Sequence, residues 1–404
     1  MLKNYFQFAR ANHHFLLFGL LTAFFGNYGQ SFFIAWFGAS FQTAFDLSNT
    51  EYGLVYSSAT LVSGFLILLV GGLLDKTPLI KFTLFTSLGL ISACLLLFFA
   101  EYVWQLVLAI FLLRFCGQGL MFHIAFTSMA RYFTENRGKA IGLVSFGMPI
   151  GEAILPAIAI SLITMIGWRH TWLVLGIFFA IGFIPLMLWL LNQSKELLSQ
   201  SEQKQSSEQN KNNWTRKQVV KDKKFWLLMP AIMAPAFIVT GLFIHQSVLL
   251  ESKRWSEQWF AIGFIVYAAS HLKSSLVVGS LVDKYSGKTL LRYYLSPMLL
   301  GVILLALPLE HEVFTLVFMF LIGLTIGASG PIVGSLWVEV YGSQSIGAIR
   351  SMVTSLMVVS TAISPILFGW LFDNAISFSE LMSHLVIYLI FAWLLSDKLA
   401  LKEQ

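Results

Sequence analysis

The sequence GGLLDK at residues 71–76 returns as GSLVDK at residues 279–284, an offset of 208 residues between the two aspartates. Three further pairs of landmarks share an offset of 209 residues: Tyr132 and Tyr341, Gly138 and Gly347, and Pro156 and Pro365. Four landmarks at nearly one spacing predict that the chain consists of two tandem structural units.

The composition around this repeat is that of a membrane protein. Hydrophobic residues make up 57% of the 404 positions and charged residues only 11%, whereas soluble domains carry about 25% charged residues. So few charges could not cover a soluble globule, and the same composition excludes a disordered chain or a collagen. The two cysteines exclude a disulfide scaffold and look like small buried hydrophobes.

Twelve apolar runs are long enough to be considered as membrane-spanning helices, each of which needs about 20 residues. They lie near residues 15–41, 52–74, 82–100, 105–130, 140–166, 171–192, 225–250, 259–281, 293–309, 313–338, 347–371 and 382–396. The polar stretch 193–224 divides these runs six and six, so we expect an N-terminal bundle at 1–192, a flexible cytoplasmic linker at 193–224 and a C-terminal bundle at 225–404.

The distribution of basic residues predicts the orientation. With both termini in the cytoplasm, 21 of the 26 lysines and arginines fall in inner segments and only three, Arg169, Lys253 and Arg254, in outer loops. The net charge of +6 is then explained by topology and by attraction to anionic lipid, so no nucleic-acid partner is expected.

With its twelve runs, its six-plus-six division and its repeated G-x-L-x-D-K, the chain resembles the major facilitator superfamily. Arg114-x-x-Gly117-x-Gly119 is similar to the Arg motif of that family's fourth helix. GWRHTW at 167–172, IHQS at 244–247 and GAIRS at 347–351 resemble a bacterial subgroup without an assigned substrate. The resemblance implies an all-α membrane fold of two pseudo-symmetric six-helix bundles, a transport function and alternating access to the two sides of the membrane.

Enzyme motifs are absent from the sequence: it has no Gly-rich phosphate loop, no paired Cys/His metal spacing and no nucleophile elbow. We therefore expect neither an enzyme nor a bound cofactor or metal. Transport would have to be driven by an ion or substrate gradient.

Three charged residues fall in the middle of predicted spans, where a charge costs roughly 2.5–3.5 kcal/mol on insertion scales. They are Arg114, Glu152 and Lys273. Glu152 could face Arg114 in its own half or Lys273 across the cleft, and either arrangement could form a proton switch or a static ion pair. The two cations leave one positive charge in excess, which predicts an anionic substrate.

Polar residues inside the spans are weaker candidates for the substrate and proton-coupling site. His245 and Gln246 lie in the seventh span, Gln30 occupies a similar place in the first, and in this family both spans line the cavity. The remaining candidates are Gln118 and His271.

The repeated inner loops are predicted to form a cytoplasmic gate. Its residues are Gly71, Asp75 and Lys76 in the first copy and Gly279, Asp283 and Lys284 in the second. Plain interfacial charge is the competing interpretation.

The sequence thus predicts a monomeric secondary active transporter in a bacterial inner membrane, moving a small organic anion with proton coupling. The alternative is a proton-driven exporter of amphipathic compounds or of a siderophore-like metabolite. A non-transporting membrane receptor or scaffold is a third interpretation, which the short polar linker and tails disfavour.

Overall fold

The protein is all-helical in the computed structural model, which describes residues 2–75, 77–133, 136–195, 216–341 and 346–401. Each of the twelve apolar runs is helical, and the described residues contain no strand. Nine helical stretches of the described chain are long and apolar enough to cross a membrane, and one of them, Gly138–Gln193, contains two of the predicted spans. The chain is an all-α membrane protein with twelve transmembrane helices in two six-helix bundles.

The helices gather into two compact units. Unit 1 comprises Met1–Phe37 and Ser58–Gln209, and unit 2 comprises Gly38–Ser57 and Asn210–Gln404. Residues 196–215 of the predicted linker lie outside the described residues, and the short helix α13 (Arg216–Lys221) follows them.

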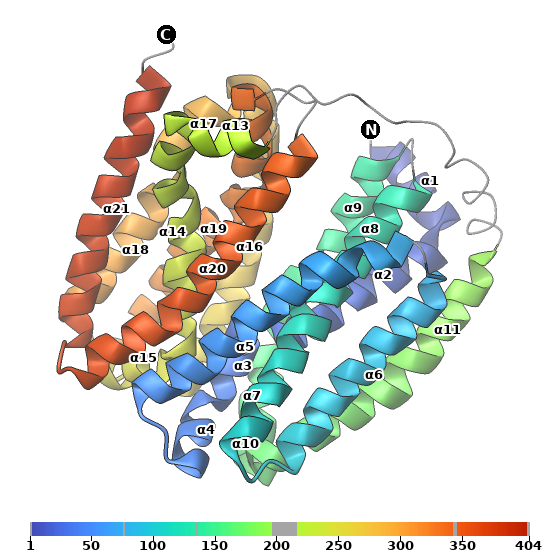
Figure 1. The fold of residues 1–404 in the computed structure, drawn as a ribbon, viewed down its shortest axis with the longest axis horizontal. Helices are drawn as coiled ribbons and strands as arrows, with labels where there is room; N and C mark the ends of the chain where they lie inside the picture. Colours follow the sequence, from blue (N-terminus) through green and yellow to red (C-terminus); the bar gives the residue numbers. More distant parts are fainter. Residues whose placement is uncertain (1, 76, 134–135, 196–215, 342–345, 402–404) are drawn as a thin grey trace. The chain divides into compact units, whose positions relative to one another are not determined.

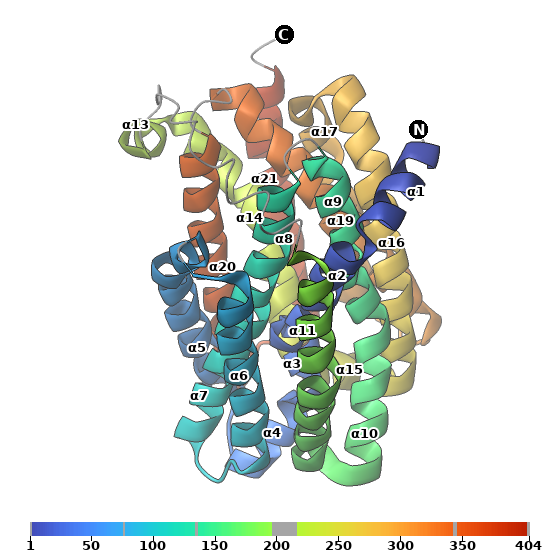
Figure 2. The same cartoon turned by 90° about the vertical axis from the view of Figure 1, so that its right-hand side faces the viewer.

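Unit 1 contains the first six spans, apart from the segment Gly38–Ser57. Within it, α6 and α11 run alongside each other (Figure 2). Its elements are α1 (Leu2–Ala11), α2 (His13–Gly26), η1 (Asn27–Gly29), α3 (Ser31–Ile34), η2 (Ala35–Phe37), most of α5 (Asn49–Val70), η3 (Gly71–Asp75), α6 (Leu79–Phe98), α7 (Val103–Leu112), η4 (Leu113–Met121), α8 (Phe122–Tyr132), α9 (Arg137–Ser145), α10 (Gly147–Phe178), η5 (Phe179–Phe183) and α11 (Ile184–Gln193).

Unit 2 contains the last six spans, in which α18 packs against α21 and α14 against α20 (Figure 1). Its further elements are α4 (Gly38–Phe45), α14 (Lys223–Ile244), α15 (Gln246–Lys253), α16 (Glu257–Tyr285), α17 (Gly287–Tyr294), α18 (Ser296–Ala306), α19 (Val313–Tyr341), α20 (Ile346–Asp373) and α21 (Phe378–Leu401).

Gly167 divides the long helix α10 into the fifth and sixth spans. Its backbone has φ 76° and ψ 160°, a conformation that residues with a Cβ rarely adopt. The turn is held by Arg169, whose guanidinium donates to the carbonyl of Ala100 at 2.9 Å and lies 4.2 Å from the ring of Trp168. The GWRHTW motif is therefore a structural turn between two spans.

Large apolar side chains remain exposed along the spans, as they would be in contact with lipid. Met165, Ile181 and Ile387 are 78%, 71% and 66% exposed, respectively. Apolar surface of this extent is expected where a protein meets a membrane.

Candidate functional site

The first span is broken at its centre. Helix α2 ends at Gly26, residues Asn27–Gly29 form a single 3₁₀ turn, and Gln30 is extended with φ −78° and ψ 148°. The sequence predicts one continuous run here, because polar residues within 15–41 are too few to lower its hydropathy. A break of this kind leaves backbone carbonyls available to other groups.

Asn27 joins this break to the fifth span. Its side-chain amide lies 2.9 Å from the carbonyl of Phe24, 3.3 Å from that of Gly147 and 3.4 Å from that of Met148. A Cβ on Gly151 would lie only 2.0 Å from the same amide nitrogen, so glycine is needed for this approach.

Arg114 reaches the break from the fourth span. It lies in the π-helical segment η4, is 3% exposed, and donates from Nη1 to the carbonyl of Gly29 at 3.1 Å. Gly117 of the same segment lies against Gly29: a Cβ added to Gly117 would come within 2.7 Å of the backbone nitrogen of Gly29. The Arg-x-x-Gly motif thus places a buried cation on the broken first span, and π-helical turns are frequent at functional sites.

Glu152 is a buried carboxylate of the fifth span. Its side chain is 1% exposed, and it follows Gly151, the residue packed on Asn27. Unit 1 therefore carries a buried cation and a buried carboxylate on two helices that both contact the break at 27–30. Buried charges of this kind are rare in spans and mark transport pathways.

Unit 2 has a helix break near the end of its first span. Helix α14 ends at Ile244, His245 departs from helical geometry with φ −102° and ψ 34°, and Gln246 begins α15. His245 and Gln246 are 2% and 5% exposed. His245 donates from Nε2 to the carbonyl of Pro365 at 2.8 Å, which fixes the tautomer with the proton on Nε2.

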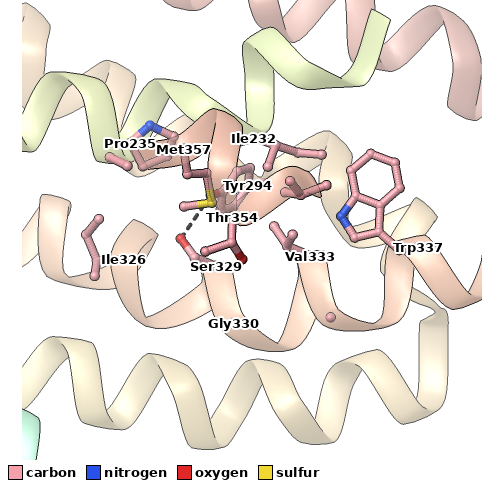
Figure 3. Close-up of a pocket in the computed structure, with 13 residues that line it drawn as sticks. Ile232, Pro235, Tyr294, Ile326, Ser329, Gly330, Val333, Trp337, Thr354 and Met357 are labelled. Atoms are coloured by element: carbon pink, nitrogen blue, oxygen red, sulfur yellow. Dashed lines mark hydrogen bonds between the residues drawn. The ribbon is translucent and has the colours of Figure 1, made fainter. Parts of the chain in front are cut away.

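Unit 2 also contains a cavity of about 440 Å³ between α14, α19 and α20, with Tyr294 at its wall (Figure 3). Its lining includes Ile232, Val333, Trp337 and Met357, and none of the described lining residues is charged. Its hydroxyl groups come from Ser329, Thr354 and Tyr294, and those of Ser329 and Tyr294 lie 2.9 Å apart. A cavity of this size and composition suits the apolar part of a small molecule.

The other predicted site residues lie in different surroundings. Gln30 and Gln118 are half-buried in unit 1. His271 is half-buried on α16 with its ring 5.9 Å from that of Tyr267, whereas Lys273, two residues later, is exposed.

The inner-loop residues are described in part. Lys76 and the side chains of Asp75 and Asp283 lie outside the described residues. Gly71 is buried and its carbonyl lies 3.0 Å from His123 Nε2, which ties the first loop to the fourth span.

In the second loop, Gly279 has no atom within 4 Å of a Cβ position, and Lys284 is exposed with its ammonium 4.9 Å from the ring of Tyr285. None of these contacts joins the two loops to each other, so the cytoplasmic gate stays a prediction.

Sequence reasoning missed two carboxylates that join helices within unit 2. Glu339 accepts hydrogen bonds from the amides of Gly287 at 2.6 Å and Lys288 at 2.9 Å, and so caps α17. Asp373 accepts from Asn49 and Thr50. Both acids lie at span ends, where the sequence shows only an interfacial charge.

Comparisons with known proteins agree with this architecture. A nucleoside transporter, NupG, superposes with a TM-score of 0.69 at 15% identity, covering 95% of this chain and 98% of that one. The inward-facing, occupied structure of a bacterial homologue of the human lysosomal transporter Spinster gives a TM-score of 0.68 at 15% identity, covering 96% and 97%.

Two curated proteins are similar in sequence. The MFS-type transporter eupM of Phoma sp is 27% identical over 149 residues, which are 37% of this chain and 52% of that protein. Monocarboxylate transporter 12 of Mus musculus is 22% identical over 344 residues, which are 77% of this chain and 66% of that protein. The chain thus spans about half to two thirds of the length of these relatives.

The sequence profile of the Major Facilitator Superfamily matches residues 16–369, most of the chain. Together with twelve helices in two bundles, this match shows that the chain belongs to the major facilitator superfamily of transporters.

Proposed function

We propose that this transporter moves a small organic anion, of the monocarboxylate type, together with protons. The observation that carries the proposal is Arg114, a buried cation held on the carbonyl of Gly29 at the break of the first span. A guanidinium binds carboxylates through paired hydrogen bonds. The mouse relative, named a monocarboxylate transporter, supports the same substrate class.

Glu152 is the proposed proton carrier. It is buried on α10 and follows Gly151, the glycine that contacts Asn27 at the break of the first span. Protonation of a buried carboxylate removes a charge from a low-dielectric site. The neutral side chain can then move more easily between a conformation open to one side of the membrane and one open to the other, because no charge has to be buried on the way. Proton uptake at Glu152 would in this way be linked to anion binding at Arg114.

The proposal includes a direction of insertion and a gate. Both termini would be cytoplasmic and the membrane would be a bacterial inner membrane, as the 21 inner basic residues indicate. Asp75 and Asp283, at equivalent inner loops, would hold the cytoplasmic side closed in one state and release it in the other.

Transport in proteoliposomes tests this function. Glu152→Gln should abolish accumulation driven by a pH gradient but retain counterflow exchange, which needs no net proton movement. Arg114→Gln should abolish both, because it removes the proposed anion partner. Arg254→Gln and Glu310→Gln are matched controls, since these residues form an exposed ion pair with N···O 3.1 Å, and both variants should transport normally.

A static Arg114–Glu152 pair gives a different result. Each single variant would then be poorly folded, and the double variant Arg114→Gln/Glu152→Gln would recover both expression and pH-driven accumulation. That recovery would rule out proton coupling through Glu152.

A second candidate function, export of amphipathic compounds, is favoured by the cavity of unit 2, whose described lining is mainly apolar and carries no charged residue. Proton-driven efflux of a cationic dye from vesicles, unaffected by Arg114→Gln, would favour this function over anion transport.

A further inference from the structure

A groove of about 350 Å³ runs along unit 2, lined by residues of α16, α17, α18 and α19. Its walls are mainly apolar and include Val277, Leu281, Pro297 and Phe320. Val277 and Phe320 are 49% and 44% exposed, so the groove is open at its surface. In transmembrane helices such exposed apolar residues lie against lipid, which makes the groove accessible from the bilayer.

Lys273 is the charged residue of this groove. None of the described lining residues is acidic. Two of the other polar groups already have partners: the Ser274 hydroxyl donates to the carbonyl of Leu324 at 2.7 Å, and that of Tyr294 lies 2.9 Å from the Ser329 hydroxyl. The ammonium of Lys273 is therefore a cation in an apolar groove whose described lining provides no counter-ion.

The depth of Lys273 limits what can neutralise it. Helix α16 ends at Tyr285, twelve residues further on, which is about 18 Å along the helix axis. The hydrocarbon core is about 30 Å thick, so Lys273 lies near its middle. The headgroup of a two-chain phospholipid stays at the membrane interface, about 15 Å away, beyond the reach of this side chain.

We propose that this groove binds a single-chain carboxylate from the bilayer, a fatty-acid anion, with its carboxylate on Lys273 Nζ and its chain along Val277 and Leu281. The volume supports one chain, because it is near the lower limit of ligand pockets, about 300–1,000 Å³. The positive charge of Lys273 supports a carboxylate. None of the described lining residues is acidic, so the counter-ion would come from the ligand, and the apolar walls require that the ligand also carries an apolar chain.

Binding of a fluorescent fatty acid, dansyl-undecanoic acid, to the full-length protein in detergent tests the proposal. Palmitate should displace the probe, whereas methyl palmitate, which lacks the charge, should not. Lys273→Gln should weaken binding about tenfold or more, because it removes a charge-assisted contact, and Lys273→Arg should retain it. Lys223→Gln, which alters an exposed lysine of α14, is the control and should bind like the wild type.

A second variant tests the groove without changing its charge. Val277→Trp would fill the groove from its rim and should prevent probe binding even though Lys273 is present. Wild-type affinity in Lys273→Gln, equal displacement by methyl palmitate, or displacement by phosphatidylglycerol in place of palmitate would each overturn the proposal.

Discussion

Asp373 caps the first turn of α5 at Thr50. Its Oδ2 accepts from the Thr50 amide at 2.7 Å and from the Thr50 hydroxyl at 2.5 Å, and its Oδ1 accepts from the side-chain amide of Asn49 at 3.0 Å. Two glycines allow the helices to approach, because a Cβ on Gly53 would lie 2.4 Å from a carbonyl oxygen of α20 and one on Gly369 would lie 2.2 Å from that of Asn49. The segment Gly38–Ser57, from the first half of the sequence, therefore packs with unit 2.

Removing this cap should loosen the start of α5. Asp373→Ala deletes the acceptor of two backbone amides, and loss of an N-terminal cap costs about 1–2 kcal/mol. Hydrogen exchange of a peptide covering residues 47–53 should become roughly five- to thirtyfold faster. Glu380→Ala is the matched control, because Glu380 caps its own helix through Ser377; equal exchange at 47–53 in both variants would contradict the prediction.

The contact between Gly151 and Asn27 should be sensitive to one added methyl group. Gly151→Ala places a Cβ about 2.0 Å from the Asn27 amide nitrogen and should destabilise the protein by about 1–3 kcal/mol through overpacking. Gly142→Ala on the neighbouring helix, where no atom lies within 4 Å, should be neutral.

A double variant distinguishes this clash from a general intolerance of alanine in α10. Asn27→Ala removes the obstructing amide, so Asn27→Ala/Gly151→Ala should cost less than the sum of the two single changes, as measured by thermal unfolding in detergent. Strict additivity would show that the two residues do not contact each other.

Filling the cavity of unit 2 should change the size of substrate that is transported. Gly330 lines this cavity and has no atom within 4 Å of its Cβ position, so Gly330→Leu should fold normally while reducing the cavity. We expect uptake of bulky aromatic acids to fall and that of acetate-sized acids to persist, with Gly330→Ala intermediate. A uniform loss for all substrates would place the cavity outside the substrate site.

Stability at alkaline pH should depend on Lys253, the last residue of α15, which lies beyond the seventh predicted span. Burial lowers the pKa of this lysine below its ordinary value of 10.5, an effect partly opposed by Glu310, and its ammonium donates to the carbonyl of Leu307 at 2.5 Å. The unfolded chain therefore binds more protons than the folded one just below pH 10.5, so this group makes stability rise with pH in that window.

Lys253→Met removes that contribution. The Tm of the wild type should rise relative to that of Lys253→Met as the pH increases from about 8 to about 10.5. Lys223→Met, which changes an exposed lysine, should follow the wild type. Parallel curves for the wild type and Lys253→Met would contradict the prediction.

The span pattern was readable from the sequence because hydropathy and charge act over whole helices. A run of about 20 apolar residues is helical in a membrane, whatever its neighbours, since every backbone group must be satisfied internally. The repeat at 71–76 and 279–284 and the family membership followed from the same regularity. Arg114 and Glu152 stood out in the sequence because a charge inside a span is costly; both are buried, and their roles stay predictions.

The tertiary structure alone decided which groups meet. Nothing in the run 15–41 shows that Asn27 ends a helix and contacts the carbonyls of Gly147 and Met148, because that break is stabilised by residues 120 positions away. Asp373 and Lys273 both appear in the sequence as single charges near or within a span. In the structure Asp373 caps a helix that is distant in the chain, whereas Lys273 lies exposed in an apolar groove. Hydropathy measures the transfer of each residue from water, whereas a site depends on the packing of helices far apart in the chain.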